Sequence, residues 1–173
     1  MLTTLERLKQ IMPEINPLDL EFFAKAASSN IVKYLNRPLE QKSITEWIAG
    51  NKNSKFLNVK LYPLLDVTSV LVDSQPTADY KIVAESGRLY REQGWIEGFQ
   101  RIEITYTGGY ILPGKDGVNL PEEIELACIL HIQDLMRTPG VTSERVGDIS
   151  VTYAPESMSN AVKSLLDGHR RFM

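Results

Sequence analysis

The stretch RIEITYTGGY, residues 101–110, decides the fold, because the hydrophobic pattern of the chain changes from strand to helix just after it. Ile102, Ile104 and Tyr106 alternate with polar residues, which is the pattern of a half-buried strand. Two glycines follow and predict a turn. Residues 120–123, LPEE, then begin a predicted helix with acidic side chains in its first turn, where the helix dipole favours them. We therefore expect β structure before this stretch and helix after it.

Further strand patterns precede this stretch. Residues 57–61 alternate between apolar and polar, and residues 68–72 are apolar or β-branched. We expect residues 80–83 to pair with 68–72 across a polar tip, residues 73–79. The middle of the chain is therefore predicted to be an antiparallel β-meander over about residues 55–106, with this tip projecting from it.

The N-terminal part carries helical periodicity. Residues 3–35 indicate two helices. Thr3 and Glu6 have the spacing of a capping box for the first helix. Asn16 followed by Pro17 is a favourable start for the second, because asparagine caps the free backbone N–H groups and proline fits the first helical turn.

The C-terminal part returns to helix. We predict helices over about residues 121–138 and 157–168, with a loop over 141–148 and a short strand over 149–153 between them. The predicted fold class is α+β: a small helical bundle with an inserted antiparallel β-meander. Since neither a repeat nor a linker is evident, we expect a single domain over residues 1–173.

Composition narrows the class of protein. With 43% apolar and 24% charged residues, the 173-residue chain has the balance of a globular protein. The net charge is −3, and the acidic excess lies within residues 111–173. No basic face is evident, so direct nucleic-acid binding is not expected as the main role. Residues 1–16 lack an export signal, no segment has the length of a membrane span, and the single cysteine excludes an internal disulfide.

One cluster of reactive residue types deserves a test as a catalytic or metal site. Cys128 and His131 lie one helical turn apart, and Asp134 follows. A zinc site needs about four ligands, but the only other histidine is His169 and there is no second cysteine. A thiol within an apolar helical run stays protonated and inert. We therefore predict a buried thiol beside a helical histidine, with no catalytic residue, no cofactor and no metal.

The remaining polar and aromatic features indicate contact surfaces. Trp95 lies in a glycine-flanked loop with Phe99 nearby, and such a tryptophan either covers its own core or anchors a partner. The segment Arg170-Arg171-Phe172 is either a frayed tail or a part that becomes ordered on a partner. Ser74 and Gln75 lie in the polar tip. We predict these residues to be the protein–protein interface.

The order of segments resembles the tailed-phage head–tail connector proteins, also called adaptors or head-completion proteins. The resemblance is carried by ITYTGGY at 104–110, LPEE at 120–123 and GVTSERVGDISVTY at 140–153. An N-terminal helix ending in YLNR at 34–37 fits as well. The resemblance extends from about Leu5 to Tyr153.

This resemblance implies a structural role without catalysis. Members form a ring, usually of twelve copies, beneath the portal protein, extend the DNA channel and carry the stopper or tail-completion protein. DNA would pass through without sequence-specific binding. The final helix with residues 170–172 would dock on the portal, and the tip at 73–79 would reach a neighbouring subunit or the next ring. The implied location is the virion neck, with the host cytoplasm before assembly.

Three alternatives stay open at the level of sequence. The first is a tail-completion, stopper or other phage assembly protein, although a stopper is expected to be mostly β-barrel. The second is a small cytoplasmic enzyme that uses the cluster around Cys128. The third is an interaction module without a connection to phage.

Overall fold

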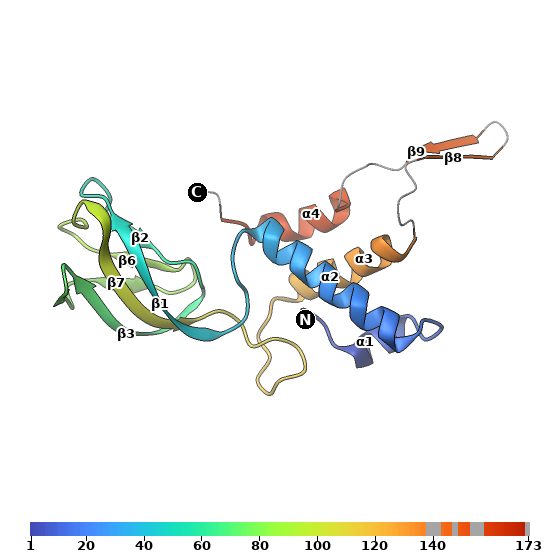
Figure 1. Ribbon diagram of the computed structural model, residues 1–173, viewed down its shortest axis with the longest axis horizontal. Helices are drawn as coiled ribbons and strands as arrows, with labels where there is room; N and C mark the ends of the chain where they lie inside the picture. Colours follow the sequence, from blue (N-terminus) through green and yellow to red (C-terminus); the bar gives the residue numbers. More distant parts are fainter. Residues whose placement is uncertain (138–142, 147–148, 153–157, 172–173) are drawn as a thin grey trace. The chain divides into compact units, whose positions relative to one another are not determined.

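The computed structural model describes residues 1–137, 143–146, 149–152 and 158–171 (Figure 1). The chain divides into two compact units. The helical unit contains residues 1–36 and 112–173, and the β unit, residues 37–111, is inserted between its two parts. The predicted α+β class with an inserted antiparallel β unit is confirmed. The assignment of a single domain stays a prediction.

The helical unit consists of α1 (Leu5–Ile11), α2 (Pro17–Leu35), α3 (Glu122–Arg137) and α4 (Asn160–Asp167), with a hairpin of β8 (Ser143–Val146) and β9 (Ile149–Thr152) between α3 and α4. Helix α2 packs against α1 and α3, and α3 also packs against α4. Each helix buries an apolar stripe, for example Leu20, Ile31 and Leu35 on α2. In the described part of the chain, no helix is both long and apolar enough to cross a membrane.

Local capping explains where the first two helices begin. Asn16 caps α2 as predicted, since its Oδ1 accepts a hydrogen bond from the Leu18 N–H at 2.9 Å. The cap of α1 is Thr4, which accepts from Arg7 N–H, and not the predicted Thr3. Thr3 is buried and its Oγ1 donates to Glu125 Oε1 at 3.0 Å, so its hydroxyl is committed to a tertiary contact instead.

Two C-terminal predictions require correction. The predicted loop over 141–148 contains strand β8, because residues 143–146 pair with β9 residue by residue. The last helix begins at Asn160, later than the predicted 157, after Ser159, whose side chain makes no capping hydrogen bond. The predicted strand residue Tyr153 lies outside the described residues.

The β unit contains seven strands: β1 (Lys42–Gly50), β2 (Phe56–Asn58), β3 (Leu64–Val72), β4 (Gln75–Pro76), β5 (Lys81–Val83), β6 (Arg88–Tyr90) and β7 (Gly98–Gly108). They form two antiparallel sheets, in the orders β1-β7-β3-β4 and β2-β6-β5. Figure 1 shows β7 running along β1. The inner faces of both sheets line one core, to which Leu57, Leu89, Val70, Ile102 and Ile104 contribute.

The strand order differs from the predicted pairing. Residues 81–83 pair with β6 and not with β3, and the partner of β3 across the tip is the two-residue strand β4. Asp73 and Ser74 form a two-residue turn with positive φ values of 51° and 64°. Such values are those of a type I′ hairpin turn, for which Asp is well suited. Strand β1 lies before residue 55 and was outside the predicted insertion.

The first and last residues of the β unit lie side by side. The Gln41 N–H donates to the Tyr110 carbonyl at 2.8 Å, and the Tyr110 N–H donates to the Leu39 carbonyl at 2.7 Å. Beside them, Arg37 is buried, donates to the Tyr62 carbonyl at 2.8 Å and stacks with its Cζ 3.6 Å from the Tyr62 ring centroid. Hydrogen bonds therefore join the beginning of the β unit to its end.

A buried carboxylate joins the four-stranded sheet to the segment that connects β2 with β3. Glu46 is 6% exposed on β1, and its Oε1 accepts hydrogen bonds from the Tyr106 hydroxyl and, at 3.0 Å, from the Lys60 N–H. The Tyr106 hydroxyl in turn accepts from the Leu61 N–H at 3.0 Å. Burial, together with the bond to Glu46, raises the pKa of Tyr106 well above its ordinary value. Lys60 and Leu61 follow β2 and belong to no strand, so these side chains satisfy backbone N–H groups that no strand ladder pairs.

Loss of this carboxylate should destabilise the β unit. We expect Glu46→Ala to lower the free energy of unfolding by about 2–4 kcal/mol, because it leaves the Lys60 N–H and the Tyr106 hydroxyl without an acceptor. Both tryptophans, Trp47 and Trp95, lie in the β unit, so urea unfolding followed by tryptophan fluorescence measures the effect. The exposed Glu97→Ala serves as control and should stay within about 0.5 kcal/mol of wild type. Equal stabilities for both variants would contradict the role given to Glu46.

Candidate interaction surfaces

One end of the β unit presents an aromatic side chain on a strained segment. Gly98 and Gln100 have φ values of 138° and 52°, and the register of β1 with β7 shifts in this region. This irregular start of β7 turns Phe99 outward, where it is 80% exposed. A large apolar side chain held out in this way, on backbone that a regular strand does not need, suits contact with another molecule.

The hairpin turn between β3 and β4 is fixed to the same end. The Asp73 N–H donates to the Arg101 carbonyl at 3.0 Å, and the Asp73 carboxylate accepts from Arg101 Nε at 2.6 Å and from a second guanidinium nitrogen. The guanidinium also donates to the Glu97 carbonyl at 3.1 Å. Asp73, through its hydrogen bond and charge, raises the pKa of Arg101. The predicted residues Ser74, Gln75 and Phe99 are thus brought to one end, which we call the β tip.

Trp95 belongs to the core of the β unit. It is 1% exposed, and its Nε1 donates to the Lys55 carbonyl at 3.2 Å. The Arg91 guanidinium carbon lies 5.8 Å from its ring centroid. Of the two alternatives that the sequence left open, the geometry matches the one in which this tryptophan covers its own core. The β tip therefore presents Phe99 and not Trp95.

The C-terminal segment is tied to its own helical unit. The Tyr34 hydroxyl on α2 donates to Asp167 Oδ1 at 2.6 Å, and this bond raises the pKa of Tyr34. The Arg170 guanidinium carbon lies 4.9 Å from the Tyr34 ring centroid. His169 Nε2 lies 3.9 Å from Glu123 Oε2 on α3. Arg170 is exposed and Arg171 half-buried, while Phe172, the third predicted residue, lies outside the described residues.

The cluster around Cys128 and His131 is a buried polar seam between α2 and α3. Cys128 is 0% exposed, and its Sγ lies 3.7 Å from Ser28 Oγ. His131 is 1% exposed, and its Nε2 lies 3.1 Å from Asn30 Nδ2, while its Nδ1 has no hydrogen-bond partner among the described residues. Burial raises the pKa of the Cys128 thiol to about 11 and lowers that of His131.

The geometry of this seam fits a structural role better than a catalytic or metal-binding one. A thiol with a pKa of about 11 is almost fully protonated at neutral pH and is a poor nucleophile or metal ligand. Within the described residues, no group of three or more His, Cys, Asp or Glu side chains is placed to hold a metal ion. The predicted buried thiol beside a helical histidine agrees with this geometry.

The chain matches a known family over nearly its whole length. The model of the family described as "Head completion protein" matches residues 3–172. No curated protein sequence matches the chain.

Solved structures share the fold. A chain in the neck of an empty GTA particle computed with C6 symmetry gives a TM-score of 0.60 at 16% identity, over 92% of this chain and 81% of that chain. A chain in the neck of a native GTA particle computed with C12 symmetry gives 0.58 at 14%, over 89% and 82%. A chain in the virion of a native gene transfer agent (GTA) particle gives 0.56 at 17%, over 92% and 80%.

The buried thiol should resist modification. We expect Cys128 in the folded protein to react with a disulfide reagent at least about 100-fold more slowly than in the unfolded chain, since burial denies access and keeps the thiol protonated. The release of the coloured thiolate with and without denaturant measures both rates. A folded-state rate near that of the unfolded chain would overturn the structural assignment of this cysteine.

The buried histidine should make the helical unit sensitive to acid. The unfolded chain takes up a proton on His131 near pH 6.5, while the folded state resists it because its pKa is lowered. The stability is therefore fully present above pH 6.5 and is lost as the pH falls from there towards the folded-state pKa, by at most about 1.4 kcal/mol per pH unit. Urea unfolding followed by circular dichroism between pH 8 and 5.5 measures this loss. His131→Gln should remove it, and the control His169→Gln should retain it.

Proposed function

We propose, because this chain belongs to the head completion protein family, that it is a structural subunit of the neck between the head and the tail of a phage-like particle. Membership confirms the family that the sequence resembles. It also confirms that the chain is a structural protein and not an enzyme, so the alternative built on Cys128 is set aside. Its location would be the virion neck, with the host cytoplasm before assembly.

The observation that carries this proposal is the extent of the family match. It spans residues 3–172 and so includes both the helical unit and the inserted β unit. The fold shared with chains from GTA necks covers about nine-tenths of this chain. A neck role is therefore supported by the whole architecture and not by one helix or one hairpin.

The finer proposal is a closed ring around the DNA path. The GTA neck structures were computed with C6 and C12 symmetry, which supports a ring of copies, and twelve is the number we propose. Twelve copies at −3 each carry about −36. Negative charge around a channel repels the DNA backbone, so DNA passes without being held and without sequence-specific binding.

Two surfaces are proposed to meet the other neck components, the portal protein and a stopper or tail-completion protein. The first is the β tip with Ser74, Gln75 and Phe99, where burial of an exposed phenylalanine is worth roughly 1.5–3 kcal/mol. The second is the C-terminal segment with Arg170, Arg171 and Phe172, of which Arg170 contacts Tyr34 on the helical unit. We assign the C-terminal segment to the portal, and the β tip to a neighbouring subunit or the next ring.

The direct experiment is to isolate particles that contain a tagged copy of the chain. Mass spectrometry of the purified complex should identify a portal protein and a second neck protein, and electron microscopy should show rings. A monomeric chain that is absent from particles, together with normal particle assembly in its absence, would refute the neck role.

The β tip can be tested by one substitution. We expect Phe99→Ala to fold normally, because an 80% exposed side chain contributes little to stability, and to lower incorporation into particles about 10-fold or more. The matched control is Leu18→Ala on α2, an apolar residue that is 73% exposed on the helical unit. Quantitative mass spectrometry of purified particles measures both variants. Wild-type incorporation of Phe99→Ala would remove the β tip from the neck contacts.

A further inference from the structure

The β unit has two outer sheet faces of unlike chemistry. The outer face of the four-stranded sheet, here the acidic face, includes Ser43, Thr45 and Trp47 from β1 and Glu103, Thr105 and Thr107 from β7. The outer face of the three-stranded sheet, here the basic face, includes Phe56, Asn58, Lys81, Val83, Arg88 and Tyr90. Because both sheets turn their inner faces to one core, these outer faces point away from it on different sides.

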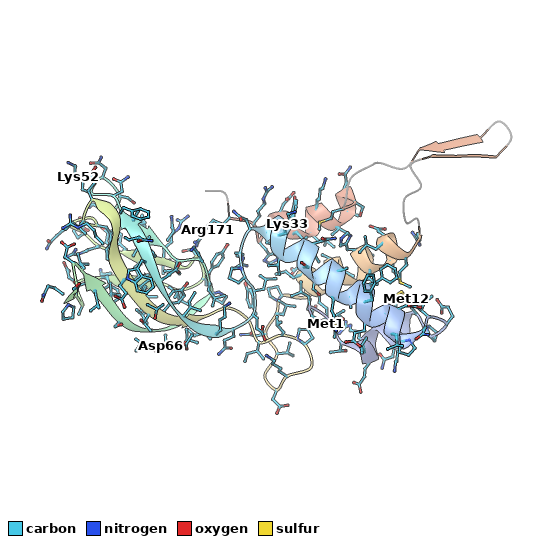
Figure 2. All side chains as sticks on the ribbon, in the orientation of Figure 1. Met1, Met12, Lys33, Lys52, Asp66 and Arg171 are labelled. Carbon is cyan, nitrogen blue, oxygen red and sulfur yellow. The ribbon has the colours of Figure 1, made fainter. Side chains whose placement is uncertain are left out.

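The acidic face is built largely from short hydroxyl side chains. Ser43 and Thr107 pair through their hydroxyls at 2.5 Å, and Thr45 and Thr105 pair at 2.8 Å. Trp47, opposite Glu103 in the register, is 55% exposed. Asp66 on β3 lies opposite Thr107, is exposed, and is labelled in Figure 2. At one end of this face Arg101 is exposed, and its charge is paired with that of Asp73. The remaining charged residues of the face, Glu103 and Asp66, are both acidic.

The basic face is aromatic and carries the opposite charge. The rings of Phe56 and Tyr90 are 5.3 Å apart, and the Arg88 guanidinium carbon lies 5.8 Å from the Phe56 ring. Phe56 and Val83 are 44% and 42% exposed. Lys81 and Arg88 are the charged residues of its three strands. At its margin Glu92 pairs with Lys55 and accepts a hydrogen bond from the Tyr90 hydroxyl, so one acid stands against the three basic residues Lys55, Lys81 and Arg88.

We propose that the basic face of one copy packs on the acidic face of the next copy, and that this contact joins neighbouring β units within the ring. This inference rests on the proposed function. Arg88 and Lys81 would meet Glu103 and Asp66, while Trp47 and Phe56 supply the apolar area. A contact between two unlike faces of one subunit is heterologous, which is the kind that closes into a ring. Like faces cannot pair, since each would bring two charges of one sign together.

The test belongs in the assembled particle. The basic face is three strands wide and its strands are three residues long, which is roughly 10 Å by 10 Å at the usual spacings. Its area, roughly 100 Å², is far below the roughly 800 Å² per partner of a stable complex. A single contact is therefore weak, and the ring gains stability by repeating it. We expect Arg88→Glu alone, and Glu103→Arg alone, each to lower incorporation into particles about 10-fold or more. The control Lys25→Glu on α2 makes the same charge change in an exposed ion pair and should incorporate like wild type.

Rescue by mixing identifies the contact as one between copies. When Arg88→Glu and Glu103→Arg are produced together, copies that alternate around an even-numbered ring restore opposite charges at every contact. Incorporation should return to within about threefold of wild type, and the chain carrying both changes should behave likewise. Circular dichroism and the urea midpoint of each purified variant verify that all of them fold.

The outcomes separate this inference from the proposed function. Single variants that incorporate like wild type, or folded singles that mixing fails to rescue, would overturn the face-to-face contact and leave the neck role intact. Absence of the wild-type chain from particles would instead refute the neck role.

Discussion

The β unit depends on one buried carboxylate that joins its four-stranded sheet to the segment leading out of β2. Between β1 and β2 the two sheets share no backbone pairing, yet both line a single core. Glu46 and Tyr106 hold the segment that leads from β2 to β3 against the four-stranded sheet, by accepting hydrogen bonds from its Lys60 and Leu61 amides. Burying an acid almost completely is costly unless its oxygens accept hydrogen bonds, so the hydrogen bonds of Glu46 require a specific geometry.

Local signals in the sequence predicted local structure well. Asn16 and Pro17 start α2 because capping needs only the neighbouring backbone. The periodicity of Ile102, Ile104 and Tyr106 likewise predicts β7, whose inward side chains are all buried. These elements could be derived because the physical cause lies within a few residues of the effect.

The parts that the sequence missed depend on distant residues. Strand β1 escaped the predicted insertion because its most buried side chain is Glu46, which breaks the apolar alternation; its partners Lys60 and Tyr106 are far along the chain. The position of Trp95 is settled by a bond to Lys55, and strand β5 pairs with β6 across a turn at Gly87. The two charged faces follow from strand register, which composition alone does not contain. Phe99, Ser74 and Gln75 were chosen from sequence, but their gathering at one end depends on the Asp73–Arg101 bond.

Backbone hydrogen bonds among Leu39, Gln41 and Tyr110 join the first and last residues of the β unit. The chain therefore enters and leaves the β unit at neighbouring points, which backbone hydrogen bonds hold side by side. The entropic cost of closing a loop grows only slowly with the number of residues in the loop. Replacing the β unit by a segment of another length therefore changes the cost of closing the chain by only about 0.6 kcal/mol per doubling of length, so the helices place little constraint on how long this insertion is.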